Sequence, residues 1–220
     1  MQKKKNFLKI VILGDSGVGK TTLLQQFLQG KVTANAKPTI GADFSKKELT
    51  VDGVSVTLQI WDTAGQEKFQ SLGYAFYRGA DCCVLCYDIT NKRTFENLDR
   101  WKEGFIENAA PYDIQTFPFM LLGNKIDKEY DRKVDSQEAQ EWAKQNCDML
   151  FYETSAKEGL SVEQAFNKLS KKALDRESRS IFSIPESIGG ASGALSLKKG
   201  QEKNSAMSNG SKTKQKSSCC

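Results

Sequence analysis

Apolar and polar residues alternate along the first 178 residues in a way that predicts strands separated by helices. Strand-like runs occur at about 7–13, 43–51, 54–61, 81–88, 117–123 and 149–154. After the first hairpin they alternate with helical patterns near 93–109, 135–146 and 161–177. This order is typical of a mostly parallel sheet with helices on both faces, which binds ligands beyond the carboxyl ends of its strands.

Short local signals refine this α/β prediction. Val51-Asp52-Gly53-Val54 contains a D-G hairpin turn, so the second of the six strands is predicted to be an antiparallel edge strand. Helix starts are indicated by the capping-box spacings Asp135-x-x-Glu138 and Ser161-x-x-Gln164. We therefore expect one domain over 6–178, a size at which a single core is well covered.

After about residue 178 the apolar periodicity stops, and Ser, Gly and Lys dominate. Such a composition cannot bury enough apolar surface to offset the entropy lost on ordering. The sequence therefore predicts a flexible tail over 179–220.

Charge is concentrated in that tail. The chain has 32 Lys and Arg against 27 Asp and Glu, a net charge of +5, and residues 181–220 hold six Lys and two Glu. The remaining body is thus nearly neutral, which argues against a nucleic-acid partner and favours a tail that lies near an anionic membrane.

The six cysteines do not indicate a disulfide framework, because Cys82, Cys83 and Cys86 crowd one apolar run. Cys83 and Cys86 fall on opposite faces of a strand, so we interpret them as buried small residues rather than metal ligands. No run reaches the 18 apolar residues of a membrane span, and the start lacks a signal-peptide cleavage site. Membrane association would then require an added group.

A phosphate-binding loop is predicted directly after the first strand. Gly14-Asp15-Ser16-Gly17-Val18-Gly19-Lys20-Thr21 matches G-x-x-x-x-G-K-[ST] and precedes a helical run. In such loops backbone N–H groups wrap phosphate oxygens, the Lys reaches the β and γ phosphates, and the Thr hydroxyl binds Mg²⁺. The strand–loop–helix context disfavours the alternative, a chance glycine-rich turn. The expected nucleotide contacts are Asp15, Ser16, Gly17, Val18, Gly19, Lys20, Thr21 and Thr22.

Two further segments at strand ends predict that the base is guanine. They are Asn124-Lys125-x-Asp127 and Ser155-Ala156-Lys157. The Asp127 carboxylate can accept from the guanine N1–H and exocyclic amine together, a donor pair that adenine lacks. We expect the Lys125 stem to lie along the ring and the Ala156 N–H to be available to the guanine oxygen. The alternatives are a solvated turn, and an ATPase in which ATP competes with GTP despite Asp127.

At this point the sequence resembles the Rab branch of the small GTPases over 6–178. The resemblance implies a P-loop NTPase small G domain that uses GTP, GDP and Mg²⁺. The late-endosomal and lysosomal Rab subfamily is the most similar in Ala42, in the Gln70-Ser71-Leu72-Gly73 run and in residues 80–84. The other stretches that carry the resemblance are 40–44, 58–61, 68–72, 76–80 and 87–90.

The resemblance implies a role for each of several further residues. Thr39 corresponds to the switch I threonine that contacts Mg²⁺ and the γ-phosphate, and Asp62 to the aspartate behind a metal-bound water. The Gly65 N–H corresponds to the γ-phosphate sensor, and Gln66 to the residue that orients the attacking water. Gln66, Lys20 and Thr39 are thus the expected catalytic residues, and Thr21, Thr39 and Asp62 the expected metal ligands.

Phe44, Trp61 and Phe76 resemble the aromatic triad through which Rabs contact effectors. The alternative is that all three rings are buried in the core, as Phe and Trp often are. The resemblance places the effector surface at 39–44 and 66–77, and loss of the γ-phosphate would release both loops.

The chemistry expected of such a site needs positioned charge and no histidine, and the chain has none. Ras-like sites turn over at about 10⁻⁴ to 10⁻³ s⁻¹ unless a partner supplies an arginine. The resemblance therefore implies a monomeric switch in vesicle trafficking. Its expected partners are an exchange factor, a GTPase-activating protein, effectors, and a GDP-dissociation inhibitor that holds a cytosolic pool.

Switch I departs from the family at Val32 and Ala36, where relatives commonly have aromatic residues. The first normally packs against the guanine edge, so we expect weaker nucleotide affinity and faster exchange. This departure leaves open a second hypothesis, a fast-exchanging recruitment module with negligible regulated hydrolysis.

The chain ends Ser217-Ser218-Cys219-Cys220. Beside a Rab-like body, Cys219 and Cys220 resemble the double geranylgeranylation signal used by the Rab escort protein and prenyltransferase; unmodified thiols are the alternative. Two lipid chains give stable anchoring where one is marginal, and Lys212, Lys214 and Lys216 add attraction to anionic lipid. We expect a location on the cytoplasmic face of late endosomes and lysosomes, or of a vacuole or phagosome.

Overall fold

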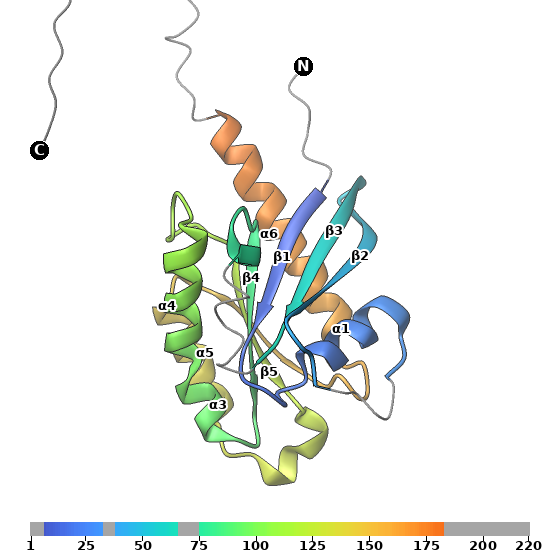
Figure 1. The fold of residues 1–220 in the computed structure, drawn as a ribbon, viewed down its shortest axis with the longest axis vertical. Coiled ribbons are helices and arrows are strands. Elements are labelled where there is room, and N and C mark those ends of the chain that lie inside the picture. Colours follow the sequence, from blue (N-terminus) through green and yellow to red (C-terminus); the bar gives the residue numbers. More distant parts are fainter. Residues whose placement is uncertain (1–6, 33–37, 66–74, 183–220) are drawn as a thin grey trace, which may run out of the picture. The chain divides into compact units, whose positions relative to one another are not determined.

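The computed structural model describes residues 7–32, 38–65 and 75–182, with side chains as far as Arg179 (Figure 1). Ala36, Gln66, Cys219 and Cys220 lie outside these residues, so the roles expected of them stay predictions.

The described strands form one six-stranded sheet in the order β2-β3-β1-β4-β5-β6. Among the described strands only the β2–β3 pair is antiparallel, so the predicted mostly parallel sheet with one antiparallel edge strand is confirmed. The strand bounds are β1 Phe7–Leu13, β2 Ala42–Val51, β3 Val54–Thr63, β4 Cys82–Asp88, β5 Phe119–Asn124 and β6 Leu150–Thr154.

The predicted hairpin joins β2 to β3. Val51 pairs with Val54, and Asp52 and Gly53 have φ values of 48° and 78°, as a two-residue hairpin turn requires. β3 continues two residues beyond the predicted end at Trp61, because Ala42 and Asp43 of β2 still pair with Thr63 and Asp62. Asp62 is therefore held on a strand rather than in a loop.

The helices confirm most of the predicted pattern. Their bounds are α1 Lys20–Gln29, α3 Lys92–Glu96, α4 Leu98–Ala109, the 3-10 helix η2 Ile126–Asp131, α5 Ser136–Gln145 and α6 Val162–Phe182. The Asp135 side chain caps α5 by accepting from the N–H groups of Gln137 and Glu138, as predicted. The helical pattern near 93–109 corresponds to two helices, α3 and α4, which are separated at Asn97. Helix α6 ends at Phe182 rather than near 177.

Each face of the sheet has its own apolar core. Helices α1 and α6 cover one face, and α3, α4 and α5 cover the other (Figure 1). Cys86 belongs to the first core and Cys83 to the second, so the prediction of buried cysteines on opposite faces is confirmed. Burial raises the pKa of the Cys86 thiol to about 12. Within the described residues, every helix is too short or too polar to cross a bilayer.

Candidate functional site

The phosphate-binding loop lies where β1 ends and α1 begins. Gly19 caps α1 with φ 99° and ψ 23°, and a Cβ on Gly19 would lie 2.4 Å from Asn124 Nδ2. Glycine is required there because the backbone is left-handed and β5 approaches closely. The N-terminus of α1 is thereby brought beside the end of β5, where its positive end favours an anion.

Lys20 is the first residue of α1, and its ammonium lies beneath the loop. Its side chain is buried, and Nζ donates to the carbonyl oxygens of Gly14 at 2.7 Å and Asp15 at 3.0 Å. Burial lowers the pKa of Lys20, and the nearby Asp62 carboxylate partly opposes the shift. A buried cation of this kind is stabilised when an anion such as a phosphate lies beside it.

Thr21, Thr39 and Asp62 come together on the other side of the loop. Thr21 Oγ1 lies 2.8 Å from Thr39 Oγ1 and donates to Asp62 Oδ2 at 2.5 Å. Burial raises the pKa of Asp62, although the hydrogen bond from Thr21 and the charge of Lys20 act in the opposite direction. The three predicted metal ligands, drawn from α1, β3 and the segment before β2, are thus adjacent.

The fit of this cluster to Mg²⁺ rests on one oxygen. Asp62 Oδ1 is buried and has no hydrogen-bond partner among the described residues. A buried carboxylate oxygen without a donor is costly unless a cation or water lies beside it. Hydroxyl and carboxylate oxygens are the ligands that Mg²⁺ accepts in nucleotide sites. The residues present therefore fit the metal.

Gly65 follows β3 and lies against the phosphate loop. A Cβ there would lie 2.3 Å from Ser16 N and 2.5 Å from Asp15 O, distances that no side chain tolerates. The Gly65 N–H, which is expected to contact the γ-phosphate, therefore lies beside the phosphate loop. Gln66 follows Gly65 and lies outside the described residues.

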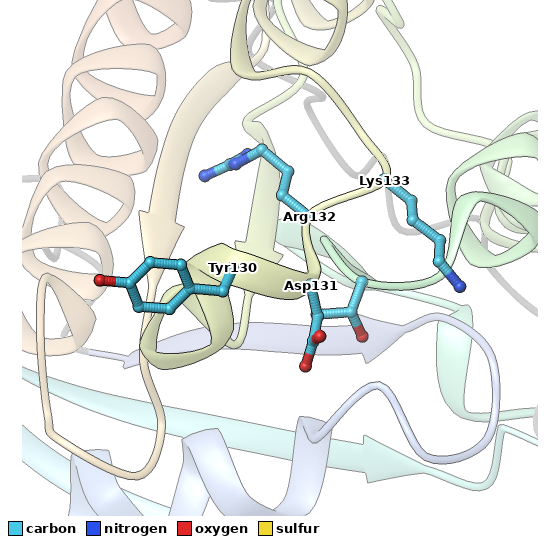
Figure 2. Close-up of a pocket in the computed structure, with 5 residues that line it drawn as sticks. Tyr130, Asp131, Arg132 and Lys133 are labelled. Carbon is cyan, nitrogen blue, oxygen red and sulfur yellow. The ribbon is translucent and has the colours of Figure 1, made fainter.

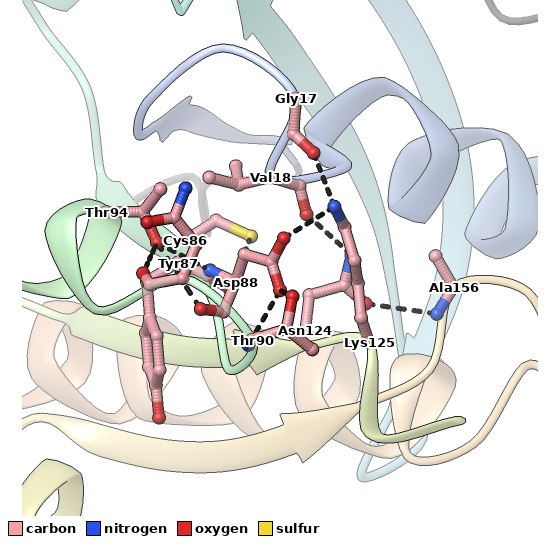
Figure 3. Close-up of polar contacts among 11 residues, drawn as sticks. Gly17, Val18, Cys86, Tyr87, Asp88, Thr90, Thr94, Asn124, Lys125 and Ala156 are labelled. Atoms are coloured by element: carbon pink, nitrogen blue, oxygen red, sulfur yellow. Dashed lines mark hydrogen bonds and ion pairs between the residues drawn. The ribbon is translucent and has the colours of Figure 1, made fainter. Parts of the chain in front are cut away.

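Asn124 connects the phosphate loop to the predicted base site (Figure 3). Its Nδ2 donates to Val18 O at 2.8 Å, and its Oδ1 accepts from Ala156 N at 3.1 Å and from Thr154 Oγ1 at 3.3 Å. The Ala156 N–H, which is expected to be available to guanine, donates to Asn124 in this arrangement, and its contact with guanine stays a prediction. A guanine oxygen would have to share or replace this hydrogen bond.

Lys125 lies across the same site with its backbone at φ 76°. Its Nζ donates to Gly17 O at 2.7 Å and to Asp88 Oδ2 at 2.6 Å (Figure 3). Burial raises the pKa of Asp88, but the hydrogen bonds from Lys125 and Thr90 outweigh it, so the net shift is downward. The sequence did not predict that Asp88 is the partner of Lys125, although residues 87–90 are among the stretches that resemble Rab proteins.

Asp127 is joined to the segment after β6. Its Oδ1 accepts from Ser155 Oγ at 2.7 Å, and Ser155 Oγ also accepts from the Glu158 N–H at 3.1 Å. The two predicted base-recognition segments are therefore brought together by hydrogen bonds. Lys157 is exposed and Thr22 is half-buried on α1, and no hydrogen bond of either side chain is found in the described structure.

A pocket of about 460 Å³ lies beside the base-recognition segments rather than at the phosphate loop (Figure 2). Its lining includes Thr90, Tyr130 and Arg132. The Arg132 guanidinium donates to Glu153 at 2.6 Å and to Glu129 at 2.7 Å. Because Glu129 is in η2 and Glu153 is in β6, Arg132 links β6 to the helix that carries Asp127.

Phe44, Trp61 and Phe76 form a contiguous aromatic surface. Ring centroids lie 4.9 Å apart for Phe44 and Trp61 and 4.8 Å apart for Trp61 and Phe76. Phe44 is 40% exposed and the other two rings are half-buried, so the alternative in which all three lie in the core is wrong. Their role in effector binding stays a prediction.

Comparison with known proteins gives consistent matches along the body. Residues 9–175 match the Ras family. A Rab-7a from Dictyostelium discoideum is 55% identical over 186 residues, which cover 84% of this chain and 92% of the relative. Rab7 from Drosophila melanogaster is 52% identical over 188 residues, covering 84% and 90%. The GTP-binding protein YPTC5 from Chlamydomonas reinhardtii is 51% identical over 188 residues, covering 84% and 91%.

Proposed function

The chain belongs to the Ras family, among its Rab7-type small GTPases, and we propose from this that it is a membrane-anchored switch of vesicle trafficking at the late endosome. It binds GTP and GDP with Mg²⁺ and hydrolyses GTP slowly. The observation that carries the proposal is the buried Lys20 ammonium beneath the glycine loop, next to the cluster of Thr21, Thr39 and Asp62, in which Asp62 Oδ1 has no hydrogen-bond partner among the described residues.

Different residues of the site bind the phosphates, the metal and the base. The loop backbone and Lys20 hold the phosphates, while Thr21, Thr39 and Asp62 hold Mg²⁺. When bound there, Mg²⁺ would supply positive charge that offsets the negative charge developing on the phosphates. Gly65 and Thr39 report the third phosphate, and Gln66 orients the attacking water. Asn124, Lys125, Asp127, Ser155, Ala156 and Lys157 form the base site.

Regulators and effectors in general follow from membership of the family. We further propose that Phe44, Trp61 and Phe76 form the effector surface, and that Cys219 and Cys220 receive two prenyl groups through an escort protein and a prenyltransferase. A GDP-dissociation inhibitor would then maintain a cytosolic pool. The proposed domain division is 6–178 for the G domain and 179–220 for the tail.

Two measurements test the function. The purified chain should carry GDP or GTP, identified after denaturation by chromatography, and ATP should not displace it. Single-turnover GTP hydrolysis should be slow alone, fall further when EDTA removes Mg²⁺, and rise steeply with a GTPase-activating protein. Adenine nucleotide in the purified protein would contradict the proposal.

The second hypothesis, a fast-exchanging module without regulated hydrolysis, is not favoured by the Rab7 relatives. Its remaining support is Val32, which is half-buried at the end of the described part of switch I. A rise in hydrolysis with an activating protein would exclude it.

Val32→Phe is expected to slow GDP dissociation. An added aromatic contact of about 0.5–1.5 kcal/mol corresponds to roughly 2- to 12-fold. Stopped-flow release of a fluorescent GDP analogue measures this, with Val32→Leu as the control for added volume alone. Equal rates for the parent and Val32→Phe would mean that this position does not contact the guanine edge.

A further inference from the structure

The side chain of Asp15, the second residue of the phosphate loop, contacts the start of α4. Asp15 Oδ2 accepts from Asn97 Nδ2 at 2.6 Å, and Oδ1 accepts from Trp101 Nε1 at 2.7 Å. The Arg100 guanidinium lies 3.8 Å from Oδ1 on the exposed side. Both oxygens of one carboxylate are thus held by neutral donors from a helix 80 residues further along the chain.

The start of α4 places the two donors to Asp15 on the same side of the helix. Asn97 lies at the break between α3 and α4, and Trp101 is one turn further, so the two donors lie on the same face. Trp101 is 3% exposed and belongs to the core that α4 forms with the sheet. The indole N–H of Trp101 therefore has a fixed position, and its hydrogen bond fixes the position of the Asp15 carboxylate.

The backbone of Asp15 is part of the phosphate site. Its carbonyl accepts from Lys20 Nζ at 3.0 Å, and the same carbonyl is the group that a Cβ on Gly65 would meet at 2.5 Å. A single residue thus joins α4, through its side chain, to the lysine and the γ-phosphate sensor, through its backbone.

We propose that Asn97 and Trp101 are positioning residues that act through Asp15 to hold the phosphate loop in its nucleotide-binding shape. The proposal rests on the proposed function of the loop. Charge-assisted hydrogen bonds are the stronger kind, and a loop ordered in advance loses less entropy when it closes around phosphates. We call the hydrogen bonds of Asn97 and Trp101 to Asp15 the clamp. The clamp therefore lowers the rate of nucleotide dissociation.

Trp101→Phe tests the clamp because it removes the N–H donor and keeps a buried aromatic ring. GDP dissociation in excess Mg²⁺ should become roughly 3- to 10-fold faster. Trp142→Phe is the matched control: Trp142 lies against Phe95, with ring centroids 6.0 Å apart, and belongs to α5 rather than to the loop contact. It should release GDP at the parent rate.

A charge exchange separates positioning from general stability. Asn97→Asp places a second carboxylate against Asp15 and should speed GDP release at least as much as Trp101→Phe. Adding Asp15→Asn restores a donor and an acceptor in the pair, so the double variant should return toward the parent rate. A fold defect alone would make the double variant worse than either single one.

Hydrogen exchange of residues 14–19 gives a readout that does not depend on bound nucleotide. Trp101→Phe should increase exchange there in the nucleotide-free chain, while Trp142→Phe should not. A parent chain without guanine nucleotide would overturn the proposed function alone. Parent-like exchange and parent-like GDP release in both Trp101→Phe and Asn97→Asp would overturn the clamp.

Discussion

Lys20→Met is expected to weaken GDP binding by roughly 10²- to 10⁴-fold, because breaking a buried charge interaction costs about 3–5 kcal/mol. The ammonium is buried under the loop and has only the Gly14 and Asp15 carbonyls as hydrogen-bond acceptors in the described structure. A bound phosphate would give the Lys20 ammonium a negatively charged hydrogen-bond acceptor. Competition with a fluorescent GDP analogue at fixed Mg²⁺ gives the affinity.

The same substitution should not destabilise the nucleotide-free chain. Burial lowers the pKa of Lys20, so the charged form is less favourable in the folded than in the unfolded state near neutral pH, and Met removes that cost. Thermal unfolding without nucleotide should thus match or exceed the parent, and only the stabilisation by GDP should be lost. Lys168→Met, on an exposed position of α6, is the control with parent affinity. Parent-like GDP binding by Lys20→Met would mean that the phosphates lie elsewhere.

Gly65→Ala is expected to lower single-turnover GTP hydrolysis by roughly 10²- to 10³-fold, the effect of losing one oriented donor to the transition state. The added methyl would lie 2.3 Å from Ser16 N and 2.4 Å from the Asp15 carbonyl carbon, so the backbone around residue 65 must move away from the loop. The third phosphate would lose its sensor. GDP dissociation should change much less, because GDP lacks the third phosphate that the Gly65 N–H is expected to contact.

Gly104→Ala is the matched control for Gly65→Ala. Gly104 lies in α4 with no atom within 4 Å of its Cβ position, so a methyl group fits there. Hydrolysis should stay at the parent rate, and the free energy of unfolding should rise by about 0.5–1 kcal/mol because alanine favours helix. If Gly65→Ala also hydrolyses GTP at the parent rate, Gly65 does not act as the sensor.

The order of strands and helices could be predicted because the apolar pattern is regular where the sheet is buried on both sides. β4 is fully buried, and its short, nearly continuous apolar run is typical of a strand in a parallel sheet covered on both faces. The D-G turn and the Asp135 cap depend on local chemistry alone, and both appear as expected. The phosphate loop was predictable for the same reason, since its glycines and lysine are adjacent in sequence.

The remaining features depend on contacts between distant residues. The end of β3 at Thr63 is set by pairing with Ala42, whereas Asp62 before it is a residue type depleted in strands, so the extension could not be predicted from the sequence. The break at Asn97 interrupts a helical pattern that continues on both sides, and its side chain is engaged by Asp15. Asp88 is likewise recognisable as the partner of Lys125 only once β4 lies beside β5.

The edge strand β2 affects whether copies of the chain associate when their local concentration is high. A ten-residue edge strand offers unpaired backbone groups on which another strand can add, which is a route to aggregation. Charged side chains at Lys46, Lys47 and Glu48 lie in the middle of this edge. Such charges oppose strand addition, since an incoming copy in register would bring like charges together. Copies that the proposed lipid anchors bring close together are therefore expected to stay folded and separate.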